Sequence, residues 1–158
     1  MDSRDEKFKV EQVMLGNLQV VLLNGVIDED TDLSALNKMQ GPLTFNFKGV
    51  TSINSCGVRN WVNFIKAIEG REISYEECPP LIVRQMNMVP SFTGQAQVRS
   101  VFVNYVCDKC EKEKWVLISS DEFKTGAKNI KETLPCDCNG KGEMEFDGHP
   151  KQYFAFSK

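Results

Sequence analysis

The fold of the second half of the chain depends on residues 98–118, which read VRSVFVNYVCDKCEKEKWVLI. β-Branched and aromatic side chains fill this stretch up to Val106, which is typical of a strand. Cys107 and Cys110 follow at a spacing that lets two thiols on a tight turn point at one centre. Residues 114–118 have the composition of a returning strand. We therefore predict a β-hairpin with a pair of cysteines at its tip.

A second pair of cysteines, Cys136 and Cys138, lies further along the chain. If the two turns come together, they supply four sulfur ligands, which is the set that tetrahedral Zn²⁺ prefers. Asp108, Asp137 and His149 are the residues nearby that can substitute as a ligand. Four sulfurs close the coordination shell and leave no position for a catalytic water. We therefore predict one structural zinc ion bound by all four cysteines of the two pairs.

The segment 98–158 is too small to bury a core of its own without help, and a structural metal supplies that help. Two further strands are expected, one around Met144 and Phe146 and a last one over Tyr153 to Phe156. From Val98 to about Phe156 the segment resembles a zinc ribbon, with the four cysteines at the ligand positions. Residues 98–158 are therefore predicted to form a small β-rich part. Strand 98–106 can belong to this part, to the sheet before it, or to both.

Other uses of the four cysteines stay open at this point. Two reduced pairs of structural thiols, or two disulfides, fit the same spacing, although disulfides are disfavoured in a reducing compartment. A C-x2-C pair also occurs in thiol exchange, so a redox-switched pair at Cys107 and Cys110 is an alternative.

The first 97 residues alternate between strand-like and helix-like patterns. The expected strands are 17–27, 43–53 and 73–75, and the expected helical segments are 33–36, 58–68 and 81–89. Strands that alternate with short helices favour a mixed or largely parallel sheet with helices packed against one face. We therefore predict an α/β module over residues 1–97.

The longest of these helices begins at a turn made of Asn54, Ser55, Cys56 and Gly57. Asn54 and Ser55 can each cap free amide groups at the helix N-terminus. Cys56 is expected to be partly buried as a small hydrophobic side chain. An N-cap alone explains Ser55, but this residue also stands where a partner or a kinase can reach it.

Three stretches of residues 8–95 resemble STAS domains, the fold of bacterial anti-sigma-factor antagonists. They are Leu23–Asp28 followed by an acidic stretch, Val50–Val58 at a strand-to-helix turn, and Cys78–Met88. The resemblance implies a mixed sheet and aligns Ser55 with the regulatory phosphoserine of that family. It also places Asn54 at the family's Asp and Cys56 at its second Ser or Thr. A phosphate on Ser55 would suit a helix N-terminus and would add about two negative charges to a docked surface.

Composition limits the function classes. A formal net charge of −3 and a pI near 5.3 argue against a nucleic-acid or anionic-lipid partner. A single histidine removes most Ser-His and Cys-His catalysis, so we expect no enzyme. No apolar run of about 18 residues and no signal sequence is present, so a cytoplasmic protein without membrane contact is expected.

These observations predict a regulatory protein that binds a partner protein through residues 54–57 and the helix that follows. A kinase acting on Ser55 would gate that binding. A thiol-based redox sensor and a nucleic-acid-binding ribbon are the alternatives.

Overall fold

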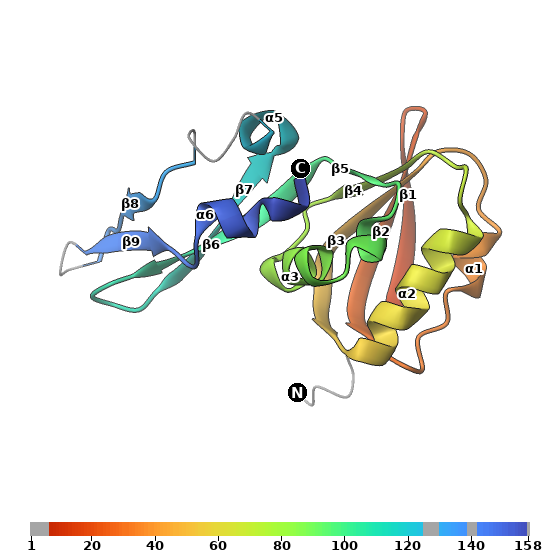
Figure 1. Ribbon diagram of the computed structural model, residues 1–158, viewed down its shortest axis with the longest axis horizontal. Coiled ribbons are helices and arrows are strands. Elements are labelled where there is room, and N and C mark those ends of the chain that lie inside the picture. The colour runs from red at the N-terminus through yellow and green to blue at the C-terminus, as the bar shows by residue number, and fades with distance from the viewer. Residues whose placement is uncertain (1–6, 125–129, 139–141, 158) are drawn as a thin grey trace.

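The computed structural model of the chain describes residues 7–124, 130–138 and 142–157. These residues form a five-stranded sheet in the first half of the chain and a four-stranded sheet in the second half. In Figure 1 the two sheets lie side by side, with helices in front of the first. The prediction of an α/β sheet, followed in the sequence by a smaller β-rich part, is confirmed.

The first sheet is mixed and its strands follow one another in chain order. Its strands are β1 (Lys9–Leu15), β2 (Leu18–Ile27), β3 (Leu43–Ile53), β4 (Ile73–Glu76) and β5 (Gln97–Val98). β1 and β2 form an antiparallel hairpin, whereas β2, β3, β4 and β5 are parallel neighbours. β1 lies at an edge of the sheet and is almost fully exposed, so it carries no apolar pattern that sequence reasoning can detect.

The helices of this part connect the parallel strands and cover one face of the sheet (Figure 1). They are α1 (Ser34–Asn37), α2 (Ser55–Ala67), α3 (Pro80–Met88) and α4 (Pro90–Thr93). Crossover connections between parallel strands are right-handed, and these crossovers all advance in the same direction across the sheet. The helices therefore fall on the same face.

Aromatic side chains fill the space between this face and the helices. Phe45, Phe47, Trp61, Tyr75 and Phe92 are fully buried, and the rings of Phe47 and Tyr75 lie 5.0 Å apart. Trp61 Nε1 donates to Tyr75 Oη over 2.9 Å, and that hydroxyl donates to the carbonyl of Phe92 over 2.6 Å. This chain of hydrogen bonds joins β4 to α2 and α4, and it satisfies both buried polar groups.

The second sheet is antiparallel and curled, with strand order β7-β6-β9-β8. Its strands are β6 (Ser100–Cys107), β7 (Glu113–Ser119), β8 (Thr133–Pro135) and β9 (Glu143–Phe146), and α5 (Ser120–Phe123) follows β7. β6 and β7 form the predicted hairpin, and β8 and β9 form a second one.

The stretch 98–106, which the sequence leaves between the two parts, is divided at Arg99. Val98 pairs with Tyr75 in the first sheet, whereas Ser100 begins β6 in the second. Cys78 joins the two sheets, because its N–H bonds the carbonyl of Ser100 and its carbonyl accepts from Phe102. The buried side chains of both sheets therefore form one continuous core.

The prediction of a last strand over Tyr153 to Phe156 is wrong. The chain forms helix α6 (Pro150–Tyr153) and then a 3₁₀ helix over Ala155–Ser157. Pro150 occupies the first position of α6, where its fixed φ favours a helix and its missing N–H costs nothing. Phe154 is buried and stacks on Phe123 at 5.6 Å, so packing against α5 replaces the expected strand pairing.

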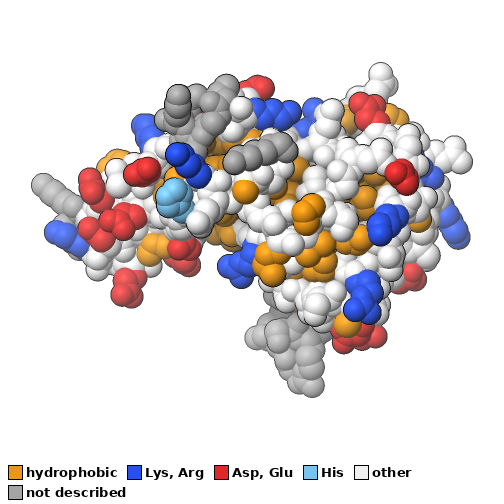
Figure 2. All heavy atoms as spheres, in the orientation of Figure 1, with side chains coloured by type: hydrophobic (Ala, Val, Ile, Leu, Met, Phe, Trp, Pro, Cys, Tyr) orange, Lys and Arg blue, Asp and Glu red, His pale blue; other side chains and the backbone are white. Residues whose placement is uncertain are grey.

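Charges on the face shown in Figure 2 are mixed. Lys and Arg side chains of the described residues are spread singly over this face and do not merge into one basic strip. No helix in the described ranges is long and apolar enough to cross a membrane.

Candidate metal centre

Backbone pairing between β6 and β9 brings the two cysteine turns together. Cys107 ends β6 opposite Met144 of β9. One residue later, the Asp108 N–H bonds the carbonyl of Glu143, and the Glu143 N–H bonds Asp108 Oδ1, both over 3.0 Å. Cys136 follows β8, and its N–H bonds the carbonyl of Gly142 just before β9. The tips of the two hairpins are thereby fixed side by side.

The four thiols meet at one point between these tips. All four Sγ atoms of Cys107, Cys110, Cys136 and Cys138 lie within 4.8 Å of one another. The Cys107 and Cys138 sulfurs are 3.8 Å apart, and those of Cys110 and Cys136 are 3.7 Å apart. A tetrahedral shell with Zn–S bonds of about 2.3 Å has sulfur separations of about 3.8 Å. Two of the six sulfur separations have this length and the others are at most 4.8 Å, so the four sulfurs can close around one zinc ion with small side-chain movements, and all four cysteines are free thiols.

Backbone amides point at the sulfurs, as expected where thiolates bind a cation. Cys107 Sγ accepts from the N–H groups of Lys109 and Cys110, each over 3.4 Å, and Cys138 Sγ accepts from Gly142 N–H over 3.4 Å. The amides of Cys110 and Lys109 lower the pKa of the Cys107 thiol to about 7. The Cys138 amide likewise lowers the pKa of the Cys136 thiol, but burial and the neighbouring thiols outweigh this effect and raise that pKa to about 12. Four thiols this close do not ionise together unless a cation offsets their charge.

Gly142 is required by the crowding at this centre. A Cβ atom at this position would lie 2.6 Å from Cys107 Sγ and 2.8 Å from Asp108 Oδ1. Any side chain here would push the Cys107 turn away from the other two sulfurs. Sequence reasoning missed this residue, because a glycine next to a turn has many explanations.

The other predicted ligand candidates do not join the cluster. Asp108 uses its Oδ1 to hold the Glu143 amide, and Asp137 is exposed. His149 lies beyond the other end of β9 and lines a separate pocket. Within residues 7–124, 130–138 and 142–157, the four cysteines are the one group of His, Cys, Asp or Glu close enough to hold an ion. The donor set is thus all sulfur, which suits zinc.

The second predicted site, residues 54–57, lies at the start of α2. Asn54 is the N-cap, and its Oδ1 accepts from Gly57 N–H over 2.8 Å. Ser55 and Cys56 are exposed, so the expected partial burial of Cys56 is wrong. The reason is the close approach of Gly57 to β2, since a Cβ there would lie 2.1 Å from the Ile27 carbonyl oxygen. Gly57 faces the sheet, and its two predecessors therefore face outward.

The acidic loop after β2 holds this turn in place. Asn54 Nδ2 donates to Glu29 Oε2 over 2.9 Å, and Asn60 Nδ2 donates to the Asp28 carbonyl over 3.1 Å. The bond from Asn54 also lowers the pKa of the Glu29 carboxyl group. The two loops lie at the carboxyl ends of the adjacent parallel strands β2 and β3, where α/β folds commonly bind ligands. Ser55 thus stands on a surface that is already acidic.

Comparisons with known proteins assign no family. A scan against models of protein families finds none that matches this chain, and a search of curated proteins finds no relative. The resemblance of residues 8–95 to STAS domains therefore stays a prediction, and the geometry of the cysteine cluster is what remains to indicate function.

Proposed function

We propose that the chain is a non-enzymatic regulatory protein whose β-rich part is stabilised by one zinc ion on Cys107, Cys110, Cys136 and Cys138. The convergence of four sulfurs to within 4.8 Å of one another, with two separations equal to those of a tetrahedral shell, supports this proposal. Four sulfur ligands leave no open position on the metal for substrate or water. The ion is therefore structural, and its chemistry is to hold the two hairpin tips together as a cross-link.

The second hairpin of this sheet needs such a cross-link because its two strands are short. β8 has three residues and β9 has four, and the two strands pair over three residues, as β9 does with β6. Binding of a structural metal contributes its free energy directly to folding in small domains of this kind. Loss of zinc is thus expected to unfold the second sheet before the first, whose core contains the aromatic cluster around Trp61.

The surface that we propose for a partner protein comprises residues 54–57 and α2. Ser55 and Cys56 are exposed there, and the turn is anchored on the acidic loop that contains Glu29. A partner of basic character fits this surface by charge. Phosphorylation of Ser55 by a cytoplasmic kinase would add about two negative charges, strengthen binding to a basic partner and repel an acidic one.

The structural role of the metal is tested by removing it from the full chain. We would record ¹H–¹⁵N correlation spectra of the zinc-loaded protein before and after chelation. The expected result is loss of dispersion for residues 100–118 and 142–157, with the signals of β2, β3 and α2 retained. Loss of no signals would contradict a structural zinc. Cys56→Ser is the matched control, because this cysteine lies outside the cluster.

The partner surface is tested by capture from a cell lysate with wild-type chain, Ser55→Asp and Ser91→Asp. Ser91 is an exposed serine on α4 and serves as the control for added charge. A protein whose recovery changes with Ser55→Asp but not with Ser91→Asp supports the gate. Equal recovery by all three would remove Ser55 from the proposed interface.

A redox sensor is the second candidate, and the exposure of Cys110 favours it. Peroxide would oxidise two thiols to one disulfide and would itself be reduced to two waters, with loss of the zinc ligands. The sulfur separations of 3.8 and 3.7 Å favour the pairs Cys107–Cys138 and Cys110–Cys136. Release of zinc, with these two disulfides found in a peptide map, would support a redox sensor. Thiols that stay reduced in mild peroxide would exclude it.

A further inference from the structure

β7 is the outer strand at one end of the second sheet, and no described strand pairs with its free side. It pairs with β6 over all seven of its residues in a continuous register, without a bulge. Outer strands are commonly kept short or interrupted by a proline, because their free backbone groups can pair with another chain. β8, at the other end of the sheet, has three residues and ends at Pro135. The edge of β7 is therefore the one that is open to a further strand.

Backbone hydrogen bonds at both ends of β7 show which of its residues face this free edge. The Cys107 N–H bonds the Lys112 carbonyl over 2.9 Å, and the Ser120 N–H bonds the Arg99 carbonyl over 2.8 Å. In an antiparallel pair, hydrogen-bonded residues alternate with residues that are not bonded to the neighbouring strand. The even-numbered residues of β7 therefore bond β6. The N–H and C=O groups that point to the free edge belong to the odd-numbered residues, which are Glu113, Trp115, Leu117 and Ser119.

Two of these residues form an apolar patch on one face of the sheet. Trp115 is 46% exposed and Leu117 is 47% exposed, and they share a face because they are two positions apart. Phe102 of β6 lies opposite Leu117, and its ring is 5.4 Å from that of Trp115. This face is the reverse of the one that contributes Val103 and Tyr105 to the core. A half-exposed tryptophan packed on a buried ring is typical of the centre of a protein interface.

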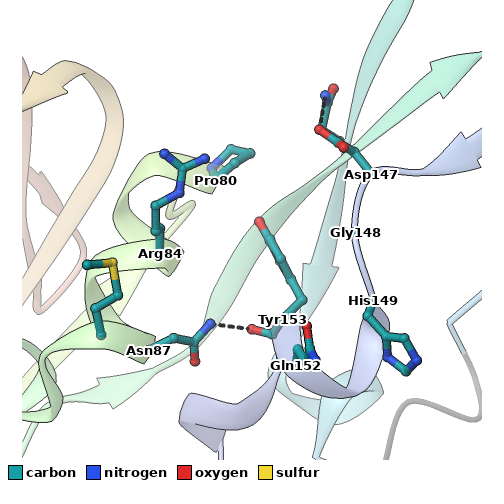
Figure 3. A pocket seen from close by; sticks show the side chains of 10 residues that line it. Pro80, Arg84, Asn87, Asp147, Gly148, His149, Gln152 and Tyr153 are labelled. Atoms are coloured by element: carbon teal, nitrogen blue, oxygen red, sulfur yellow. Dashed lines mark hydrogen bonds between the residues drawn. The ribbon is translucent and has the colours of Figure 1, made fainter.

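Charged side chains leave this patch accessible. Glu113 is the acidic residue of β7 on the same face, and its Oε1 accepts from Asn104 Nδ2 over 3.0 Å. The bond turns Glu113 back toward β6 and away from the free edge. Asp147, which lines the pocket in Figure 3, accepts from the same amide over 3.3 Å and holds it in place. Lys114 follows Glu113 directly and therefore lies on the reverse face of the strand.

We propose that the edge of β7 pairs with β7 of a second copy of this chain, antiparallel and about a two-fold axis at Val116. In this register Trp115 lies opposite Leu117 of the second copy, and the axis repeats the pair on its other side. Both residues have free backbone groups, so they exchange N–H···O=C bonds while their side chains pack. Glu113 lies opposite Ser119, so no like charges oppose each other on this face. The contact uses the same surface on both copies and closes as a dimer.

Other registers lose this match. A shift by one residue sets the free backbone groups opposite residues that already bond β6. A shift by two residues places either Glu113 opposite Leu117 or Trp115 opposite Ser119. The strand is thus complementary to itself in one register, which favours a second copy of the chain over an unrelated strand as the occupant.

The outer strand of the first sheet, β1, is as long as β7 but lacks such a patch. Its most exposed apolar residues, Met14 at 58% and Leu15 at 61%, are consecutive in the chain. They therefore lie on opposite faces of the sheet. β1 serves as the control edge in the test.

The test is analytical ultracentrifugation of the zinc-loaded full chain at concentrations up to about 1 mM. A reversible equilibrium between monomer and dimer is expected. Leu117→Glu should raise the dissociation constant of the dimer at least about tenfold, because it places a carboxylate opposite Trp115 on both sides of the axis. Met14→Glu makes the same change of charge on β1 and should dimerise as wild type does. A monomer at every concentration, or a dimer that Met14→Glu weakens and Leu117→Glu does not, would overturn the proposal.

A cysteine at the two-fold axis tests the register. Opposite residues that are not hydrogen-bonded have Cα atoms about 4.5 Å apart, within the range of about 4.4–6.8 Å that a disulfide spans. The background is Cys56→Ser, which removes the exposed cysteine outside the metal cluster. Val116→Cys should form a disulfide-linked dimer on mild oxidation, whereas Lys114→Cys should not, because Lys114 lies opposite Ile118. No linked dimer with Val116→Cys, or equal linkage by both variants, would refute the register.

Discussion

Gly142→Ala tests the geometry of the metal centre without removing a ligand. The added Cβ would lie 2.6 Å from Cys107 Sγ, whereas ordinary contacts begin at 3.4 Å, so the sulfur must retreat by 3.4 − 2.6 = 0.8 Å. In the zinc-bound state Cys107 is fixed by the metal and cannot retreat freely. Overpacking of this kind costs about 1–3 kcal/mol. Because each 1.4 kcal/mol is tenfold, zinc affinity should fall about 5- to 150-fold.

The assay is competition for zinc between the protein and a chromophoric chelator. Glu143→Ala is the matched control, since Glu143 is the adjacent, exposed residue and its contact to Asp108 uses the backbone. The control should retain wild-type affinity. Wild-type affinity in Gly142→Ala as well would show that the Cys107 sulfur does not occupy the position described, and the argument from sulfur distances would fail.

Three other predictions concern the core, the helix cap and the thiols. Trp61→Phe removes buried volume and the N–H that donates to Tyr75, so it should lower the free energy of unfolding, measured in urea, by about 1–3 kcal/mol. The control Trp115→Phe changes an exposed side chain and should have little effect. Equal losses in the two variants would contradict this prediction. Asn54→Ala should lower the free energy of unfolding in the same assay by about 1 kcal/mol, because it removes the N-cap of α2. Asn54→Ser should retain most of the wild-type stability, because serine also caps helices. Equal stability of the two variants would exclude the cap. Zinc affinity should rise with pH, because thiolates are the ligands. Since the pKa of Cys107 is about 7, zinc binding below pH 7 displaces about one more proton than binding above it. A plot of the logarithm of the zinc association constant against pH should therefore be steeper below pH 7 than above it. A constant slope would contradict this prediction.

Patterns that are local in the sequence predicted much of the fold. The amphipathic run from Val58 to Ile65 gives α2, and the alternation of Leu43, Phe45 and Phe47 gives β3. The spacing of the two cysteine pairs was enough to expect one cluster, because each pair follows a strand and hairpin tips converge when their strands pair. In the first two cases the residues that decide the structure are neighbours in the chain, and in the third each cysteine pair is local although the two pairs meet through the pairing of β6 with β9.

What the sequence did not predict depends on contacts between distant residues. The edge strand β1 is exposed and lacks an apolar period, and the aromatic residues from Tyr153 onward suggest a strand until their packing against α5 is known. Cys56 faces outward because Gly57 approaches the backbone of Ile27. The pocket that His149 lines could not be anticipated from the sequence, since its walls come from α3, β6 and the segment after β9.

The most direct test of the central claim is native mass spectrometry of the full chain with and without chelator. We predict one zinc ion per chain, lost on chelation and absent from a variant in which Cys107, Cys110, Cys136 and Cys138 are all serine. A Cys56→Ser, Cys78→Ser variant should retain the ion, because both residues lie outside the cluster. A wild-type chain that binds no metal after purification and incubation with zinc, or a four-serine variant that still binds one ion, would contradict the account.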